Sequence, residues 1–389
     1  MTPRPVAEAL IDRIPLFPGM RVLDPGVGTG ELLRTLLDRE PAIEATGWDI
    51  DPEVLRAAGQ QLPEAALERR SALEADPSED FDLVIANPPY FQLGLEPAER
   101  TRFSGVISGR ANIFALFFQI GLEQLRPGGR LAFIVPPSMN SGAYFEALRE
   151  YLIDRTEITD LTILEGNDLF EGANTAIQLL VLEKRPETRD VASRSSPHVF
   201  LREVPEAGFR RVIFCPDPSL LAVEFEGRKT LWELGLEAVT GQVIWNENRD
   251  RLVPEDGPGR IPLVWSHSIA SGEMAGSPEG LGAVKRGKPG FYETGHGGRP
   301  PLTGPAIAVN RVVGAVGRGE LRAALIPEGV TFIAENHVNL IRPRDEASGI
   351  EWVRVLDSLR RPEVADRVRL LTGNTQISAR ELTHLLPLD

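Results

Sequence analysis

A short apolar run that stops at two prolines constrains this chain more than any other stretch. Phe81–Ala86 has the composition of a buried strand, and Asn87-Pro88-Pro89-Tyr90 follows it at once. Proline has no N–H to give to a strand ladder, so the strand has to end there and present its last side chains at a sheet edge. In an open α/β sheet, ligands bind beside the carboxyl ends of the strands. The sequence therefore predicts a ligand site at Asn87.

The residue types of this motif indicate what the ligand is. The Asn87 side-chain oxygen and the Pro88 backbone carbonyl are two acceptors, which can hold both hydrogens of an NH2 group. The Tyr90 ring offers a flat face on which a planar molecule can stack. We therefore predict a site for a planar molecule with an exocyclic amine or an amide nitrogen. The structural alternative is a strand-ending turn with a buried aromatic ring.

A glycine-rich turn precedes this motif in the context that a nucleotide-binding loop needs. A brief strand ends at Asp24, Pro25-Gly26-Val27-Gly28-Thr29-Gly30 follows, and Glu31–Asp38 has a helical pattern. About 20 residues later Asp49 closes a second strand, where it can accept hydrogen bonds from ribose hydroxyls. Ile50, next to it, can cover a purine face. We predict that these residues bind a nucleotide-like cofactor.

The order of strand-like and helical segments predicts two domains. Strands and helices alternate through residues 1–185, which is typical of a parallel, doubly wound α/β sheet. Residues 186–198 are polar and are interpreted as a linker. Residues 199–389 have short apolar runs with frequent glycine and proline, which predicts a smaller α+β domain.

Composition limits the classes of function. The formal charge is −14, which argues against a protein that coats polyanions, and the single Cys215 allows no internal disulfide. The five histidines are scattered without ligand spacing, so no metal site is predicted. The amino terminus does not resemble a signal peptide and no apolar run is long enough to cross a membrane, so we expect a cytoplasmic protein.

Taken together, these residues resemble S-adenosylmethionine-dependent N6-adenine DNA methyltransferases of bacterial restriction–modification systems. The matching subgroup has its cofactor motifs first and a carboxyl-terminal target-recognition domain. The resemblance implies a Rossmann-like class I methyltransferase sheet. It also implies that Thr2-Pro3 touches the methionine part of the cofactor, that the loop from Asp24 to Gly30 holds it, and that Asp49-Ile50 contact its ribose and adenine. Asn87-Pro88-Pro89-Tyr90 is then similar to the catalytic motif.

The resemblance extends, less closely, beyond the catalytic motif. Phe170 stands where the family has a second aromatic residue against the flipped base. After the third strand the family usually has an acid that binds the adenine amine, whereas this chain has Ser71 and Ala72, so that Ser71 or Glu74 is the expected substitute. The implied partners are double-stranded DNA and a cognate restriction endonuclease, with the enzyme itself a monomer or weak dimer.

The implied chemistry needs positioning rather than a metal or a strong base. The lone pair of an adenine amine is delocalised into the ring. Two acceptors, from Asn87 and Pro88, would tilt the nitrogen toward tetrahedral geometry and free that lone pair for methyl transfer from S-adenosylmethionine. Because a base inside a duplex is unreachable, the nucleotide is expected to flip out and to stack on Tyr90 and Phe170.

Several alternatives share parts of this pattern. A protein glutamine N5-methyltransferase of the release-factor type uses the same four residues on a planar amide, but its substrate domain usually precedes the cofactor domain. An RNA adenine or guanine methyltransferase is a further alternative. A NAD-dependent dehydrogenase leaves Asn87 to Tyr90 unexplained, and a non-enzymatic binding module leaves the complete set of catalytic residue types unexplained.

The acidity of the chain is an objection to a DNA partner, because duplex affinity depends on neutralised phosphates. Residues 1–185 hold 17 Lys and Arg against 29 Asp and Glu, a net charge of −12. Residues 281–344 hold 9 against 4, a net charge of +5. We hypothesise a local basic face, with Arg311 predicted to contact the substrate, drawn from Lys285, Arg286, Lys288, Arg299, Arg311, Arg318 and Arg322.

Overall fold

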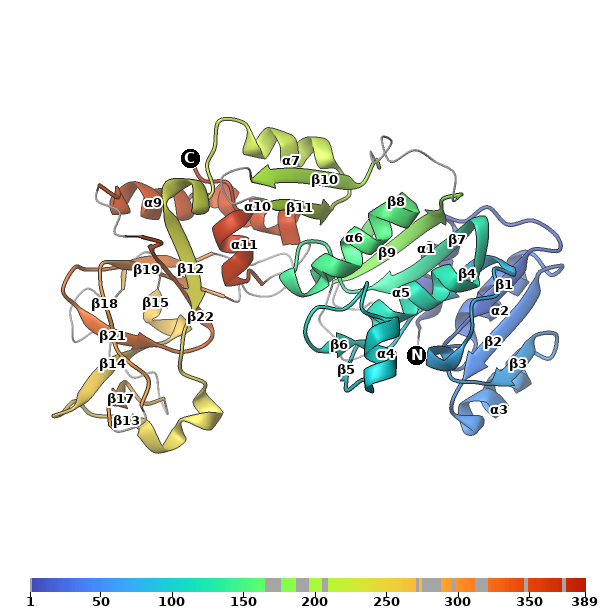
Figure 1. The fold of residues 1–389 in the computed structure, drawn as a ribbon, viewed down its shortest axis with the longest axis horizontal. Coiled ribbons are helices and arrows are strands. Elements are labelled where there is room, and N and C mark those ends of the chain that lie inside the picture. The colour runs from blue at the N-terminus through green and yellow to red at the C-terminus, as the bar shows by residue number, and fades with distance from the viewer. Residues whose placement is uncertain are drawn as a thin grey trace. The chain divides into compact units, whose positions relative to one another are not determined.

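The computed structural model divides into two compact units, Met1–Leu220 and Leu221–Asp389, called here the first and second units. Figure 1 shows both as ribbons, and each is described by itself. The described residues are 2–164, 176–186, 196–204, 209–270, 273–274, 288–295, 298–311, 321–345, 349–372 and 376–389. Within those ranges, no helix has both the length and the apolar character needed to cross a bilayer.

The first unit is built on a seven-stranded sheet, which confirms the predicted doubly wound α/β fold. Its order is β3 (Ala66–Arg69), β2 (Glu44–Asp49), β1 (Arg21–Asp24), β4 (Phe81–Ala86), β7 (Leu125–Val135), β9 (Ile177–Lys184) and β8 (Thr156–Leu164). The first five strands pair in parallel, and β9 runs antiparallel to both of its neighbours. The chain moves outward from β1 to β3 and then returns to the other side of β1 as β4. The carboxyl ends of β1 and β4 therefore meet at a topological switch point.

Helices cover both faces of this sheet because its strands are apolar on both sides (Figure 1). In β4, Leu83 and Ile85 join one buried cluster, and Val84 and Ala86 join the other. The first cluster takes in α1 and α2, and the second takes in α5 and α6. The helices of this unit are α1 (Arg4–Ile11), α2 (Glu31–Arg39), α3 (Pro52–Gln61), α4 (Pro97–Arg102), α5 (Ile113–Gln124), α6 (Glu146–Arg155), and the 3-10 turns η1 (Ala72–Glu74), η2 (Pro137–Met139) and η3 (Ala143–Phe145).

Local sequence explains where two of these helices begin. The Asp51 side chain accepts hydrogen bonds from the backbone N–H groups of Glu53 and Val54, at 2.8 and 3.4 Å, and Pro52 occupies the first turn of α3. Asn112 accepts from Phe114 N at 3.3 Å at the start of α5. Asn112 also belongs to the short strand pair β5 (Gln92–Leu93) and β6 (Ala111–Asn112), so α5 begins directly beside the loop that follows Tyr90.

The division between the units differs from the predicted boundary at residues 186–198. The hairpin of β10 (Val199–Val204) and β11 (Phe209–Phe214) belongs to the first unit rather than to the second. The reason is the side chain of Arg149 in α6, which is 1% exposed and donates to Val212 O at 2.7 Å. Phe214 also packs into the cluster that contains α5 and α6. The apolar residues of this hairpin carry no sign in the sequence of which core they join.

The second unit contains short strands and helices, as the α+β prediction requires. One antiparallel sheet has the order β12 (Leu236–Thr240), β22 (Val338–Pro343), β19 (Ala306–Asn310) and β20 (Ala323–Ile326). A second sheet has the order β13 (Leu252–Val253), β17 (Phe291–Glu293), β14 (Arg260–Val264), β21 (Thr331–Ala334) and β18 (Leu302–Thr303). The remaining elements are β15 (Ile269–Ala270), β16 (Glu273–Met274), α9 (Trp352–Leu359), α10 (Pro362–Thr372), α11 (Ala379–His384), and the turns η5 (Trp232–Leu234), η6 (Trp245–Glu247), η7 (Arg249–Arg251) and η8 (Ser266–Ser268). Helix α7 (Pro218–Phe225) crosses the division.

Candidate functional site

Most of the predicted site residues of the first unit lie at one edge of its sheet. Asp24 is the last residue of β1, and Asn87 directly follows β4. The two strands are parallel neighbours, with Leu23 paired to Val84, so their carboxyl ends face the same way. Asp49 closes β2 on the other side of β1. The edge where these strands end is therefore the candidate site.

The amide of Asn87 is held at both of its polar ends. Its Nδ2 donates to Oγ1 of Thr2 at 3.0 Å. Its Oδ1 lies 2.6 Å from the hydroxyl of Tyr90, which also lies 2.7 Å from the carbonyl oxygen of Ile134. A tyrosine hydroxyl has one proton, whereas both of its neighbours here are acceptors. This corner of the site therefore has more acceptors than donors.

The carbonyl of Pro88 adds another acceptor. No described residue donates a hydrogen bond to it. The next residue, Pro89, has no N–H that could turn back to satisfy this carbonyl. This carbonyl and Asn87 Oδ1 stay the predicted acceptors for a ligand NH2 group.

The Tyr90 ring is fixed at its edge and open on its surface. It meets Phe114 of α5 in an edge-to-face contact with centroids 6.0 Å apart, and Phe114 in turn packs on Phe145. Tyr90 remains 45% exposed, and the neighbouring Phe91 is exposed too. Burial of its hydroxyl raises the pKa of Tyr90 above the ordinary value, so the group stays a protonated donor. The exposed ring is a stacking surface with a fixed orientation.

The glycine loop is tied to the two acids at the strand ends. Gly26 N donates to Asp24 Oδ1 at 3.0 Å, and Gly28 N donates to Asp49 Oδ2 at 3.1 Å. Gly28 and Gly30 have φ angles of +54° and +90°, which side chains with a Cβ rarely adopt. A Cβ on Gly26 would lie 3.2 Å from the Phe117 ring, so this part of the loop has little space for a side chain.

Asp24 is 1% exposed, and this burial raises the pKa of its carboxyl to about 7. The hydrogen bond from Gly26 N opposes the shift, and the nearby charge of Asp49 adds to it. The carboxyl of Asp24, which directly precedes the glycine loop, therefore gains or loses its proton near neutral pH.

The end of β2 has the features of a nucleoside site. Each Asp49 oxygen accepts one backbone N–H, from Gly28 and from Asp51, and keeps a further lone pair for a hydroxyl donor. Ile50 is 68% exposed, which is unusual for an isoleucine and leaves an apolar face for a ring. Arg70 N donates to Asp49 O at 3.0 Å and brings the end of β3, with Ser71 and the buried Ala72, alongside. The residues present therefore fit an adenosine-containing cofactor.

The predicted roles of Phe170 and Thr2 stay predictions. Phe170 lies outside the described residues. Thr2 is predicted to touch the methionine part of a cofactor, and its hydroxyl also accepts a hydrogen bond from the Asn87 amide, 85 positions away. Two further groups of the site are absent from the predicted set. Phe114 has the spacing of an ordinary core residue, and for the Ile134 carbonyl a sequence carries no signal.

The proposed basic residues of the second unit are only partly described. Lys285, Arg286 and Arg318 lie outside the described residues. Arg311 and Arg322 flank Asn310 at the end of β19, since Arg322 N donates to Asn310 Oδ1 at 2.6 Å and Arg311 directly follows Asn310. Lys288 lies 4.3 Å from the centre of the Trp265 ring. None of the side chains of Lys288, Arg299, Arg311 and Arg322 forms an ion pair with a residue that the structure describes.

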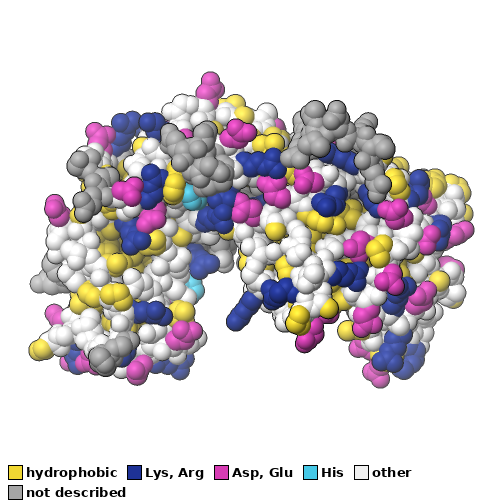
Figure 2. Space-filling model, viewed as in Figure 1, with side chains coloured by type: hydrophobic (Ala, Val, Ile, Leu, Met, Phe, Trp, Pro, Cys, Tyr) yellow, Lys and Arg dark blue, Asp and Glu magenta, His cyan; other side chains and the backbone are white. Residues whose placement is uncertain are grey.

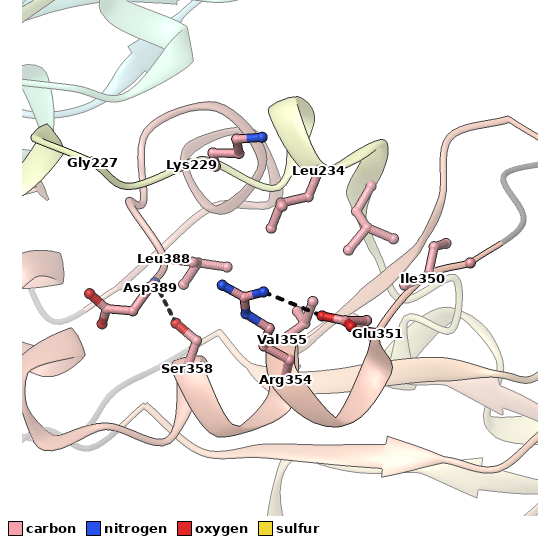
Figure 3. A pocket seen from close by; sticks show the side chains of 12 residues that line it. Gly227, Lys229, Leu234, Ile350, Glu351, Arg354, Val355, Ser358, Leu388 and Asp389 are labelled. Atoms are coloured by element: carbon pink, nitrogen blue, oxygen red, sulfur yellow. Dashed lines mark hydrogen bonds and ion pairs between the residues drawn. The ribbon is translucent and has the colours of Figure 1, made fainter.

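The second unit also has a pocket of about 400 Å³, which none of the predicted site residues lines. Lys229, Leu234, Arg354 and Leu388 are among its lining residues, and Figure 3 shows Arg354 directed toward Glu351, with which it forms an ion pair at 3.4 Å. Asp389 at its border is paired with Arg228, Arg361 and Arg367. Arg354, Glu351 and Asp389 are each already paired, so this pocket does not indicate a ligand class.

Parts of the chain are similar to known methyltransferases. Residues 48–170 match the family described as Eco57I restriction-modification methylase. Modification methylase CviBIII of Paramecium bursaria Chlorella virus NC1A is 26% identical over 215 residues, covering 53% of this chain and 54% of its own length. Type II methyltransferase M.BsuBI of Bacillus subtilis is 22% identical over 343 residues, covering 81% and 66%. A release factor glutamine methyltransferase of Caulobacter vibrioides is 32% identical over 150 residues, covering 34% and 52%. The chain thus spans roughly half to two thirds of these relatives.

Proposed function

We propose that this chain, whose residues 48–170 match restriction–modification methylases, transfers a methyl group from S-adenosylmethionine to N6 of adenine in duplex DNA. The observation that carries the proposal is the donor-poor corner around Asn87. Asn87 Oδ1 and Ile134 O both lie beside the Tyr90 hydroxyl, which has one proton, and no described residue donates to Pro88 O. An amine with two hydrogens supplies what this corner lacks.

The chain's own groups account for activation of the amine. Asn87 Oδ1 and Pro88 O accept its two hydrogens and draw the nitrogen toward tetrahedral geometry, which frees its lone pair. The Tyr90 ring holds the base plane by stacking. This is catalysis by positioning and by preorganised dipoles. A strong general base is not needed.

The cofactor groups fit the glycine loop and the strand ends. Asp49 is proposed to accept from the ribose hydroxyls, Ile50 to cover the adenine, and Ser71 and Ala72 to border it. Asp24 and the loop residues Pro25, Gly26, Gly28 and Gly30 are proposed to border the methionine end. When bound, S-adenosylmethionine supplies an electrophilic methyl group.

The second unit is proposed to recognise the DNA target. The alignment with M.BsuBI covers 81% of this chain, so it extends well beyond the first unit. Arg311 and Arg322, which form no ion pair with a described residue, suit contacts with phosphate. The adenine is then flipped out of the duplex to reach Asn87. We propose that the chain is the modification half of a restriction–modification system, with a cognate endonuclease as its partner.

The test uses purified protein, methyl-labelled S-adenosylmethionine and mixed-sequence duplex DNA, which is then digested to nucleosides. Label in N6-methyldeoxyadenosine that disappears in Asn87→Ala is the expected result. Label in another base, or label that persists in Asn87→Ala, would contradict the proposal. Gln60→Ala, which removes an exposed amide from α3, is the matched control and should retain activity.

One further candidate is methylation of a glutamine side chain in a protein. The release factor glutamine methyltransferase has the highest identity of the three relatives described, over a stretch about as long as a cofactor domain. A glutamine amide also offers a planar NH2 group to Asn87 and Pro88. Label that enters a protein substrate and not DNA would favour this candidate.

A further inference from the structure

We propose that Thr2 is a positioning residue whose hydroxyl aims the Asn87 amide, so that Oδ1 faces the substrate amine. The inference rests on the proposed function. Among the described residues, Thr2 Oγ1 is the partner of Asn87 Nδ2, at 3.0 Å. An amide has one end that accepts and one end that donates, and only the accepting end can hold an amine hydrogen. Whatever selects the orientation of this amide therefore selects an active or an inactive site.

The opposite orientation of the Asn87 amide is also favoured by hydrogen bonds. Tyr90 Oη lies between Asn87 Oδ1 and Ile134 O, at 2.6 and 2.7 Å, and it can give its one proton to only one of them. If the amide turned over, Nδ2 would donate to Tyr90 Oη, and Tyr90 would donate to Ile134 O. That arrangement satisfies both contacts but turns the amine-binding acceptor away. The Thr2 hydroxyl opposes this arrangement when another acceptor holds its proton, because Oγ1 can then only accept a hydrogen bond from Asn87 Nδ2.

Thr2 is held well enough to do this. It directly precedes Pro3, which caps α1, and both Val6 N and Ala7 N donate to Pro3 O. The apolar side of α1 is buried in the same cluster as α2. Arg4 binds Asp38 of α2 at 2.7 Å. The Thr2 hydroxyl is therefore anchored on the sheet's own helical layer.

An anionic ligand beside Thr2 would supply this acceptor for the hydroxyl proton. The hydroxyl of Thr2 has one proton, which is not needed for the bond from Asn87. A carboxylate that takes this proton leaves Oγ1 only as an acceptor toward Asn87 Nδ2. The amino acid end of the proposed cofactor carries such a carboxylate. Binding of this carboxylate to the Thr2 hydroxyl would then stabilise the Asn87 amide in the orientation that the substrate amine needs.

The first experiment compares Thr2→Val, which keeps the shape, with Thr2→Ser, which keeps the hydroxyl. We expect Thr2→Val to lower kcat about tenfold at saturating cofactor and DNA, the size of one hydrogen bond, while cofactor affinity measured by calorimetry changes much less. Thr2→Ser should restore kcat. A loss of cofactor affinity with kcat unchanged would overturn the proposal, because Thr2 would then serve the cofactor alone.

A second measurement does not depend on activity. The side-chain NH2 signal of Asn87, in protein labelled with ¹⁵N-asparagine and assigned by its loss in Asn87→Ala, should move in Thr2→Val and stay near its original position in Thr2→Ser. An unchanged signal in Thr2→Val would overturn the positioning role. If the wild-type protein methylates no DNA while this signal responds, the proposed function fails and the positioning role stands.

A double-mutant cycle tests the competition with Tyr90. In Tyr90→Phe the opposite orientation loses its partner, so adding Thr2→Val should cost less than its tenfold effect in the wild type. Equal costs in both backgrounds would show that Tyr90 does not compete for the amide, and this result would overturn the argument for a selecting role of Thr2.

Discussion

The side chains at the sheet edge around Asn87 are held by hydrogen bonds, whereas four basic side chains of the second unit are not held by ion pairs with described residues. At the edge, Asn87, Tyr90, Asp24 and Asp49 are each fixed by hydrogen bonds to described neighbours. Lys288, Arg299, Arg311 and Arg322 form no ion pair in the part of the chain that the structure describes. Chemistry on an amine needs acceptors at set positions, whereas attraction of a polyanion needs cations that are not already neutralised.

Unlike the four basic residues named above, many arginines of the first unit form ion pairs. Many of them bind acids of the same unit, and in Figure 2 the dark blue and magenta side chains are interspersed on the visible face of this unit. Examples are the pairs of Arg34 with Glu64 and of Arg102 with Glu123, both at 2.7 Å. Pairing therefore compensates part of the acidity of residues 1–185. The net charge of residues 1–185 is still −12, so we expect salt-dependent binding to come from the second unit.

The largest expected effect is that of a substitution at Asn87 on the rate of methyl transfer. Asn87→Ala removes one of the two amine acceptors and should lower the rate of methyl transfer by about a thousandfold, as loss of a preorganised polar group does. Cofactor binding, followed by calorimetry, should persist. A variant that keeps more than a tenth of the wild-type rate would mean that Asn87 does not hold the reacting nitrogen.

Substitutions of Tyr90 separate the role of the ring from that of its hydroxyl. Tyr90→Ala should weaken productive DNA binding about tenfold or more, because stacking on an extruded base is lost. Tyr90→Phe keeps the ring on Phe114 and should keep most of this affinity. Fluorescence of 2-aminopurine at the target position measures the stacked, flipped base. Equal losses in both variants would assign the effect to the hydroxyl instead.

Charge reversal tests the second unit. Replacing Arg299, Arg311 and Arg322 by Glu should weaken DNA binding and flatten its salt dependence, with the log–log slope falling by about 0.9 for each phosphate that the protein no longer neutralises. Arg56→Glu, on the exposed side of α3, applies the same change in charge per residue to the first unit and should leave the slope nearly unaltered. An unchanged slope in the triple variant would remove the basic residues from the proposed interface.

The smallest expected effect is that of Asp24→Asn on the pH dependence of the free energy of unfolding. The buried Asp24 stays protonated up to about pH 7 in the folded chain, whereas an unfolded aspartic acid ionises near pH 4. Between these values the folded state binds more protons, so Asp24 makes the free energy of unfolding fall as pH rises from about 4 to 7. Asp24→Asn should remove this contribution. Denaturant titrations at several pH values measure the difference, and parallel curves for the two proteins would contradict the buried-acid assignment.

Some parts of this protein follow from local rules and could be predicted from the order of its residues alone. Two prolines end β4 wherever they stand, because neither has an N–H for the ladder. Alternating strands and helices predict a parallel sheet, and the carboxyl end of its central strand is where a ligand site belongs. The glycine loop between Asp24 and α2 could be recognised for the same reason, since its residue types are required by backbone conformation.

The meeting of distant groups follows instead from tertiary packing. Thr2 reaches Asn87 because α1 packs on α2, and the Ile134 carbonyl reaches Tyr90 because β7 lies beside β4. The buried Arg149 assigns residues 199–214 to the first unit rather than to the second. These contacts depend on packing between segments far apart in the chain. Neither hydrophobic periodicity nor a motif encodes such packing, because the same local pattern can join either core.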